Sequence, residues 1–113
     1  MNYKEANALL KGRSSKKLCN NTYLQRRVES GAIAVMLHET DVLTLNPDGS
    51  TILDSGGWET ATTKDRINSY LQFGQVWSKR KEWSLYVNGK PTPFQDGIRI
   101  GPRGGVSVQR LGV

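Results

Sequence analysis

The sequence predicts an α+β fold in which one internal helix interrupts a mostly antiparallel, meandering β-sheet. Short runs of alternating apolar and polar residues recur between turn signals on both sides of residues 56–74, and a helix-start motif lies inside that segment. A length of 113 residues is typical of one domain. We therefore expect a single domain, 1–113, made of an N-terminal helix (1–12), a first β half (18–55), a turn and helix (56–74) and a second β half (75–110).

The N-terminal segment predicts a short amphipathic helix. Asn2 precedes Glu5 by three residues, a spacing typical of a helix start, and apolar residues follow at helical intervals up to Leu10. Gly12 then ends the helix. The basic, serine-containing residues 13–17 are expected to be a connector.

Two strand pairs are predicted in the first β half. The turn 46–49, Asn-Pro-Asp-Gly, has proline second and glycine fourth, which suits a type I turn with a glycine bulge. The expected strands are 23–28 and 32–38, joined by the turn 29–31, and then 41–46 and 50–54.

The internal helix is expected over about residues 62–73. Paired glycines at 56–57 permit positive φ and a close backbone approach. Thr62 and Asp65 form a near capping box, and apolar residues at 67, 70 and 71 share one helical face. Gly74 is placed where a left-handed C-cap is expected.

The second β half predicts short strands around tight turns. Asn88-Gly89 indicates a type I′ hairpin turn, and Pro91 and Pro93 restrict the strand that follows to a sheet edge. The expected strands are 75–78, 83–87 on the far side of the basic tip 79–82, 98–100 and 106–109.

Charge is distributed in three blocks. The net charge is +6 overall, and the blocks carry +6 over residues 1–28 (seven basic, one acidic), −6 over 29–65 (one basic, seven acidic) and +6 over 66–113 (eight basic, two acidic). Such blocks can complement each other between subunits, or the basic ones can converge on an anionic ligand. The single Cys19 fits a reducing cytoplasm, and no membrane-spanning run or signal peptide is visible.

Most catalytic classes lack their residues. One Cys and one His cannot form a zinc site, and neither a calcium loop nor a phosphate-binding loop is present. Cys19 and His38 fall on different predicted strands, where we interpret both as structural. We therefore expect no metal, no cofactor and no enzymatic activity. A metal-dependent nuclease using the acidic middle block is a minor alternative.

Recognition of an anionic ligand fits the composition better. In the second half Trp77 is interleaved with basic residues, including Arg99 and Arg103, and aromatic rings with guanidinium groups suit a nucleobase and its phosphate. Arg26 and Arg27 are adjacent on a strand and point to opposite faces. The alternative is structural, with Trp83 in the core and the basic tip 79–82 simply solvated.

The start of the internal helix is a second candidate. Thr60, Thr62, Thr63 and Lys64 surround a helix N-terminus, where free N–H groups and the helix dipole favour a phosphate or carboxylate. The alternative is that these threonines only cap and cover the helix end.

Several motifs together resemble a family of small phage proteins, the first-described type of Thoeris anti-defence sponge. The likeness covers roughly residues 18–100, and its centre is the run from Gly56 to Asn68. The motifs are Asn21-Thr22-Tyr23-Leu24, Leu37-His38-x-Thr40-Asp41-Val42, Asn46-Pro47-Asp48-Gly49-Ser50, Gly56-Gly57-Trp58-x-Thr60-x-Thr62-Thr63-Lys64-x-Arg66-Ile67-Asn68 and Phe94-x-Asp96-Gly97.

The resemblance implies a non-enzymatic function in the cytoplasm of the bacterial host. Sponges of this type bind cyclic ADP-ribose isomers and hold them without cleaving them, and some also bind cyclic trinucleotides of the CBASS system. It also implies a homo-oligomer, from dimer to hexamer, with pockets between subunits. Combining that expectation with local chemistry, our candidate nucleotide-binding residues are Arg26, Arg27, Lys64, Trp77, Arg99 and Arg103. The alternative function is a phage DNA- or RNA-binding protein that uses the basic blocks on backbone phosphates.

Overall fold

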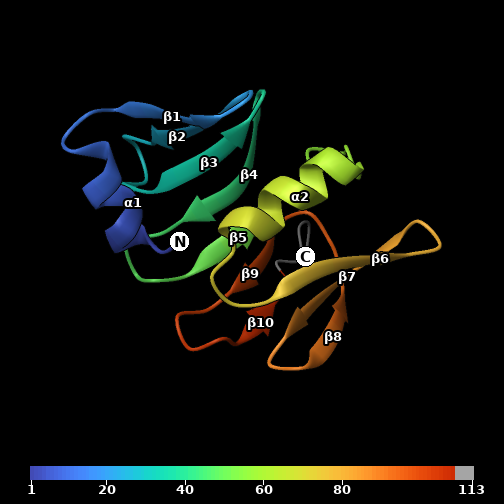
Figure 1. Cartoon of the computed structure of the whole chain (residues 1–113). Helices are drawn as coiled ribbons and strands as arrows, with labels where there is room; N and C mark the ends of the chain where they lie inside the picture. Colours follow the sequence, from blue (N-terminus) through green and yellow to red (C-terminus); the bar gives the residue numbers. More distant parts are fainter. Residues whose placement is uncertain (109–113) are drawn as a thin grey trace.

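A computed structural model describes residues 1–108 of the chain and shows two helices packed with two antiparallel sheets (Figure 1). The predicted α+β class, with an N-terminal and an internal helix, is confirmed. The helices are α1 (Tyr3–Leu10) and α2 (Ala61–Tyr70). The strands are β1 (Ser15–Cys19), β2 (Thr22–Arg26), β3 (Ile33–Leu37), β4 (Thr40–Leu45), β5 (Thr51–Leu53), β6 (Gln75–Lys79), β7 (Glu82–Val87), β8 (Lys90–Pro93), β9 (Ile98–Ile100) and β10 (Val106–Ser107). Position 109 of the last predicted strand lies outside the described residues.

The two sheets do not follow the two halves of the sequence. The seven-stranded sheet has the order β1-β2-β3-β4-β5-β9-β10, and the three-stranded sheet contains β6, β7 and β8. Thr51 of β5 pairs with Ile100 of β9, so the chain leaves the first sheet for α2 and the small sheet and then returns. This return places the loop between β8 and β9 beside the end of β5.

The prediction of a connector at residues 13–17 is wrong, because Ser15–Cys19 forms strand β1. It pairs antiparallel with β2, with Ser15 opposite Gln25. Edge strands commonly carry charged residues, which discourage pairing with other chains. Lys16 and Lys17 therefore suit this position, although their charge suggests a connector in the sequence.

The internal helix is shifted from its predicted bounds. Thr60 is the N-cap, and its side chain accepts a hydrogen bond from the Thr63 amide, so Thr62 is not the cap. The helix ends at Tyr70, and its C-cap Leu71 is extended. Gly74 therefore does not cap the helix. Its φ of 102° and the close Tyr86 carbonyl, 2.7 Å from where a Cβ would lie, show that this glycine lets the chain pass against β7.

The local turn predictions are confirmed. Asn2 caps α1 by accepting a hydrogen bond from the Glu5 amide at 2.8 Å. Asn88 and Gly89 both have positive φ, 53° and 75°, as a type I′ turn requires. Gly49, with φ of 93°, donates to the Asn46 carbonyl at 3.0 Å and closes the turn between β4 and β5.

The buried core joins side chains from both sheets and both helices. Helix α2 contacts β3, β4 and β6, and so lies between the two sheets (Figure 1). Its core residue Ile67 is fully buried. The largest fully buried side chains are Leu10, Leu24, Ile33, Val35, Val42, Leu43, Leu45, Leu53, Ile67, Val76, Leu85 and Ile98.

Candidate functional site

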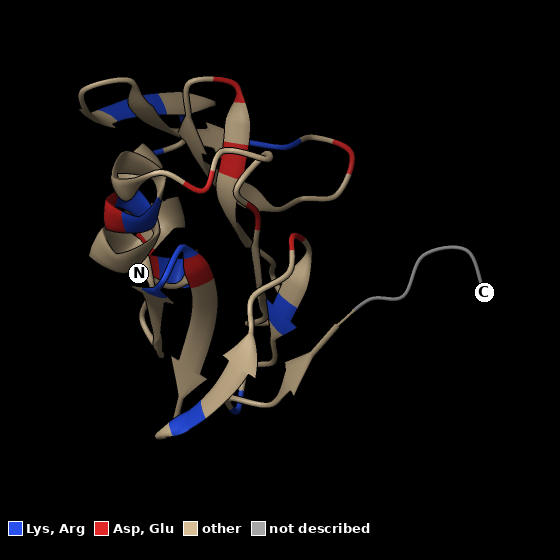
Figure 2. Cartoon of the chain, turned by 90° about the vertical axis from the view of Figure 1, so that its right-hand side faces the viewer, with Lys and Arg blue, Asp and Glu red and all other residues tan. Residues whose placement is uncertain are grey.

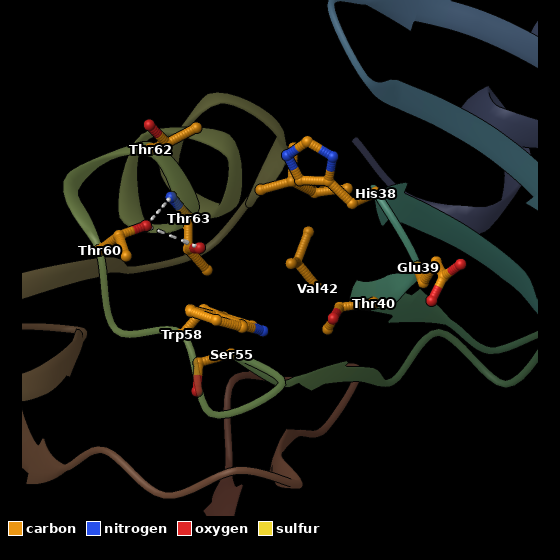
Figure 3. Close-up of a pocket in the computed structure, with 10 residues that line it drawn as sticks. His38, Glu39, Thr40, Val42, Ser55, Trp58, Thr60, Thr62 and Thr63 are labelled. Carbon is orange, nitrogen blue, oxygen red and sulfur yellow. Dashed lines mark hydrogen bonds between the residues drawn. The ribbon is translucent and has the colours of Figure 1, made fainter.

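A cleft of about 1010 Å³ opens between the β3–β4 turn and the N-terminus of α2 (Figure 3). Clefts of this size are the usual place for a small-molecule ligand. Its walls come from two parts of the chain that are distant in sequence, namely the end of β3 with the start of β4, and the loop after β5 with the first turn of α2. The lining residues are Leu37, His38, Glu39, Thr40, Val42, Ser55, Trp58, Thr60, Thr62 and Thr63.

Trp58 gives the cleft an exposed aromatic ring. The residue is 69% exposed, although its side chain is large and apolar. Its amide donates to the Ser55 carbonyl at 3.0 Å, and its carbonyl accepts from the Thr60 amide at 2.8 Å. In Figure 3 the indole and the imidazole of His38 lie on either side of Val42. The backbone is therefore tightly held where it presents an unpacked ring.

The loop that carries Trp58 is anchored by two carboxylates. The amide and the hydroxyl of Ser55 both donate to Asp96 Oδ1 at 2.7 Å, and Asp96 comes from the loop between β8 and β9. Asp54 Oδ1 accepts from the Gly56 amide at 2.6 Å. Ser55 is 2% exposed, so its hydrogen bonds have little competition from water. The return of β9 to the first sheet therefore helps to position Trp58.

A glycine is required at position 56, which lies against the cleft residue Thr40. Its φ is 64°, and a Cβ added to it would collide with the side-chain atoms of Thr40, including Cγ2 at 2.8 Å. The predicted close backbone approach at the paired glycines is thus confirmed at Gly56. Gly57 has a similar φ of 83° but faces open space.

The first turn of α2 supplies hydrogen-bonding groups. The Thr60 and Thr63 hydroxyls lie 3.1 Å apart, and Thr60 Oγ1 also accepts from the Thr63 amide at 3.2 Å. The backbone N–H groups of Ala61 and Thr62 lie in the first turn of α2, where the helix has no carbonyl one turn earlier to accept from them. They can therefore donate to a bound acceptor. Among residues 1–108, the side chains that line the cleft include no Lys or Arg, and Glu39 carries a negative charge. The cleft is suited to an aromatic base and a hydroxyl-rich sugar.

Two of the predicted arginines are engaged in ion pairs elsewhere. Arg27 Nε lies 3.0 Å from Asp41 Oδ2, and this hydrogen bond raises the pKa of Arg27. Arg99 Nη2 lies 3.0 Å from Asp48 Oδ2. The pKa of Asp48 is lowered, first by its hydrogen bonds from Ser50 and then by Arg99.

The other four predicted residues also lie outside the cleft lining. Arg26 Nε donates to the Arg13 carbonyl at 3.4 Å, and Lys64 Nζ to Ser78 Oγ at 2.6 Å. Trp77 lies in a separate hollow with Tyr86 and Asn88. Arg103 is in the loop 101–105, which approaches that hollow, because a Cβ at Gly104 would lie 3.0 Å from Asn88 Nδ2. The structure therefore groups Trp77 with the loop of Arg103 and keeps the remaining candidates apart.

Sequence reasoning named the threonines of α2 but missed Trp58 and His38 as site residues. His38 is exposed, with φ of 54°, in the turn between β3 and β4 and not in the predicted strand. The available signal for Trp58 was its position between paired glycines and a helix cap, where a large side chain has no periodic core partner. For His38 we find no comparable signal. The register of β3 against β4 shifts at a bulge near Met36, and this shift depends on how the two strands pair and not on the local sequence.

The protein-family model for Kyanoviridae Gp96 proteins matches residues 1–101. The chain belongs to this family. It is therefore a phage protein, and the Kyanoviridae are cyanophages. No curated protein and no solved structure matches the sequence. In the described part of this Gp96 protein no helix is long and apolar enough to cross a membrane, and no three metal-ligating side chains are grouped.

Proposed function

We propose that this Gp96 protein is a phage anti-defence protein that binds and sequesters cyclic nucleotide immune signals. The ligand class follows the sequence resemblance, with cyclic ADP-ribose isomers as the main ligands and cyclic oligonucleotides as a second class. The observation that supports it in the structure is the Trp58 cleft, which joins an exposed aromatic ring to a hydroxyl-rich helix N-terminus. The protein would hold its ligand without cleaving it.

In this proposal adenine stacks on Trp58. Stacking of a base on an aromatic side chain contributes roughly 1–3 kcal/mol. The ribose hydroxyls then reach the side chains of Thr60, Thr62 and Thr63, and a phosphate oxygen can accept from the first-turn amides of α2. Val42 provides an apolar wall behind the base.

Within residues 1–108, no Lys or Arg side chain lines the cleft, and this suggests how subunits assemble around it. A pyrophosphate carries charge that the α2 N-terminus alone offsets only in part, since a helix end supplies about half an elementary charge. We therefore propose that a second subunit contributes cations to the cleft, which agrees with the expected homo-oligomer of two to six chains. Sedimentation in the presence of ligand tests this. A monomer that still binds tightly would contradict it.

The test of function combines binding with recovery of the ligand. The protein is incubated with a cyclic ADP-ribose isomer, separated from free ligand and denatured by heat, and the released compound is identified by mass spectrometry. We expect the compound to return intact. Recovery of an altered compound would make the protein an enzyme, and absence of capture would overturn the proposal.

Variants locate the ligand. Trp58→Ala is expected to weaken binding about fivefold or more, because one stacked ring is lost, whereas Trp58→Phe retains an aromatic face. If Trp77→Ala weakens binding and Trp58→Ala does not, the ligand occupies the Trp77 hollow, where the sequence interpretation placed it.

A further inference from the structure

The three-stranded sheet presents an aromatic face that no other part of the described chain covers. On the inner side Val76, Trp83, Leu85 and Val87 are buried. Side chains alternate along a strand, so the intervening residues point outward. Trp77 is 56% exposed and Tyr86 is 40% exposed.

The pairing register aligns these outward residues in two rows across the sheet. One row contains Trp77, Ser84 and Pro93, and the other contains Gln75, Tyr86 and Pro91. We call these six residues the outer face. The rings of Trp77 and Tyr86 meet edge to face, with centroids 6.2 Å apart, and line a hollow of about 500 Å³ with Asn88. The outer face therefore offers two accessible aromatic side chains beside a depression.

Basic residues lie at both ends of this sheet. The β6–β7 end has Lys79, Arg80 and Lys81, and Figure 2 shows the charged positions as blue and red segments of the ribbon. The opposite end, after the β7–β8 turn, has Lys90, and the loop 101–105 brings exposed Arg103 near Asn88 of that turn. Glu82 is the acidic residue of the β6–β7 end, paired opposite Lys79. The surroundings of the outer face are thus strongly positive.

We propose that the outer face binds single-stranded nucleic acid. Bases would stack on Trp77 and Tyr86 while the backbone phosphates contact the cations at each end, the combination by which single strands are bound without sequence preference. A single strand fits better than a duplex, because paired bases are stacked on one another and cannot reach the rings. A second copy of the chain fits less well, since a two-fold contact through this face would bring its positive ends together.

This inference goes beyond the proposed function and uses different residues. None of the six outer-face residues lines the Trp58 cleft. A variant that loses cyclic nucleotide binding at the cleft should therefore still bind nucleic acid at the outer face, and the two proposals can fail separately.

The test is fluorescence anisotropy of the full chain with fluorescein-labelled oligo(dT) and oligo(U) of about 12 nucleotides, within the site sizes of other stacking surfaces. We expect both to bind, and a duplex of the same length to bind more weakly. Trp77→Ala and Tyr86→Ala should each raise Kd about fivefold or more. Trp77→Phe should retain most of the affinity.

Trp58→Ala is the matched control, because Trp58 is also an exposed tryptophan but belongs to the cleft. It should bind oligonucleotides as the wild type does. Changing Lys79, Arg80 and Lys81 together to Gln should lower the slope of log Kd against log salt by roughly 2, at about 0.7 per phosphate contact. Melting temperatures show that each variant is folded.

Three binding results would overturn the proposal. These are equal binding of the duplex, unchanged Kd for folded Trp77→Ala and Tyr86→Ala, and no binding of either oligonucleotide at low salt. If Trp77→Ala instead dissociates an oligomer, the outer face is an interface between copies of the chain and the proposal is wrong.

Discussion

The side-chain amide of Asn68 pairs with the backbone of Val76 in both directions. Asn68 Nδ2 donates to the Val76 carbonyl at 2.9 Å, and the Val76 amide donates to Asn68 Oδ1 at 2.8 Å. The Asn68 side chain thus makes the same two hydrogen bonds to Val76 that the backbone of a neighbouring strand would make. Because Asn68 lies on α2, this pair attaches the three-stranded sheet to the helix whose first turn lines the cleft.

Asn68→Ala should therefore destabilise the protein. Loss of the Asn68 side-chain amide leaves the backbone N–H and carbonyl of buried Val76 without this partner, which costs about 1–3 kcal/mol in free energy of unfolding. Urea unfolding measures the loss. Ser69→Ala is the control, because Ser69 is exposed and its hydroxyl donates only to the Asp65 carbonyl one helical turn earlier. Equal unfolding midpoints for the two variants would contradict the prediction.

Gly56→Ala and Gly57→Ala separate steric contact from backbone strain. Both residues have positive φ, so each alanine should cost about 1–2 kcal/mol of folding free energy. Only at Gly56 does the new Cβ also meet Thr40. We expect Gly56→Ala to have the lower melting temperature and to weaken ligand capture at the cleft.

The double variant Gly56→Ala/Thr40→Ala tests the steric part. Removal of the Thr40 hydroxyl and methyl should recover part of the stability lost in Gly56→Ala, so the two changes should be non-additive. Additive effects on the unfolding free energy would show that the contact is not the cause.

Asp96→Ala should loosen the loop that carries Trp58. It removes the acceptor of both the Ser55 amide and the Ser55 hydroxyl, and Ser55 is buried. Stability should fall by about 1–3 kcal/mol, and capture of the nucleotide should weaken. Asp96→Asn keeps one carbonyl oxygen and should retain more of both. Exposed Glu29→Ala serves as the control for loss of a negative charge.

Cys19 should become less reactive when Tyr70 is changed to Phe. The hydroxyl of Tyr70 lies 3.5 Å from Cys19 Sγ, and this hydrogen bond is the largest cause that lowers the pKa of Cys19. Burial, followed by the Cys19 contact, raises the pKa of Tyr70 to about 12. At the pH at which the Cys19 thiol ionises, the Tyr70 hydroxyl is therefore still protonated and can donate to the thiolate.

The measurement is the rate of Cys19 modification by a disulfide reagent as a function of pH. In Tyr70→Phe the midpoint of the rate profile should move to higher pH, because the thiolate has lost its donor. Tyr3→Phe, which lacks this contact, is the control. A midpoint that stays in place would mean that the hydrogen bond does not hold in solution.

Features set within a few residues could be predicted from the sequence. The Asn2 cap, the Asn46–Gly49 turn and the Asn88–Gly89 turn depend on side-chain capping and positive φ, which are local properties. The α+β class follows from the same kind of signal repeated along the chain. The helix end was predicted wrongly because Gly74 needs its positive φ to pass β7, a contact made by a distant residue.

Only the tertiary structure decided where the candidate site lies. Arg27 and Arg99 have the right chemistry for a phosphate, but strand pairing places them beside Asp41 and Asp48. The pairing of β9 with β5 brings Asp96 to Ser55, and the Ser55 carbonyl in turn accepts from the amide of the cleft residue Trp58. By itself the sequence determined the local turns, caps and strand periods. The arrangement of the cleft required the pairing of distant segments, because burial and charge compensation depend on which residues become neighbours.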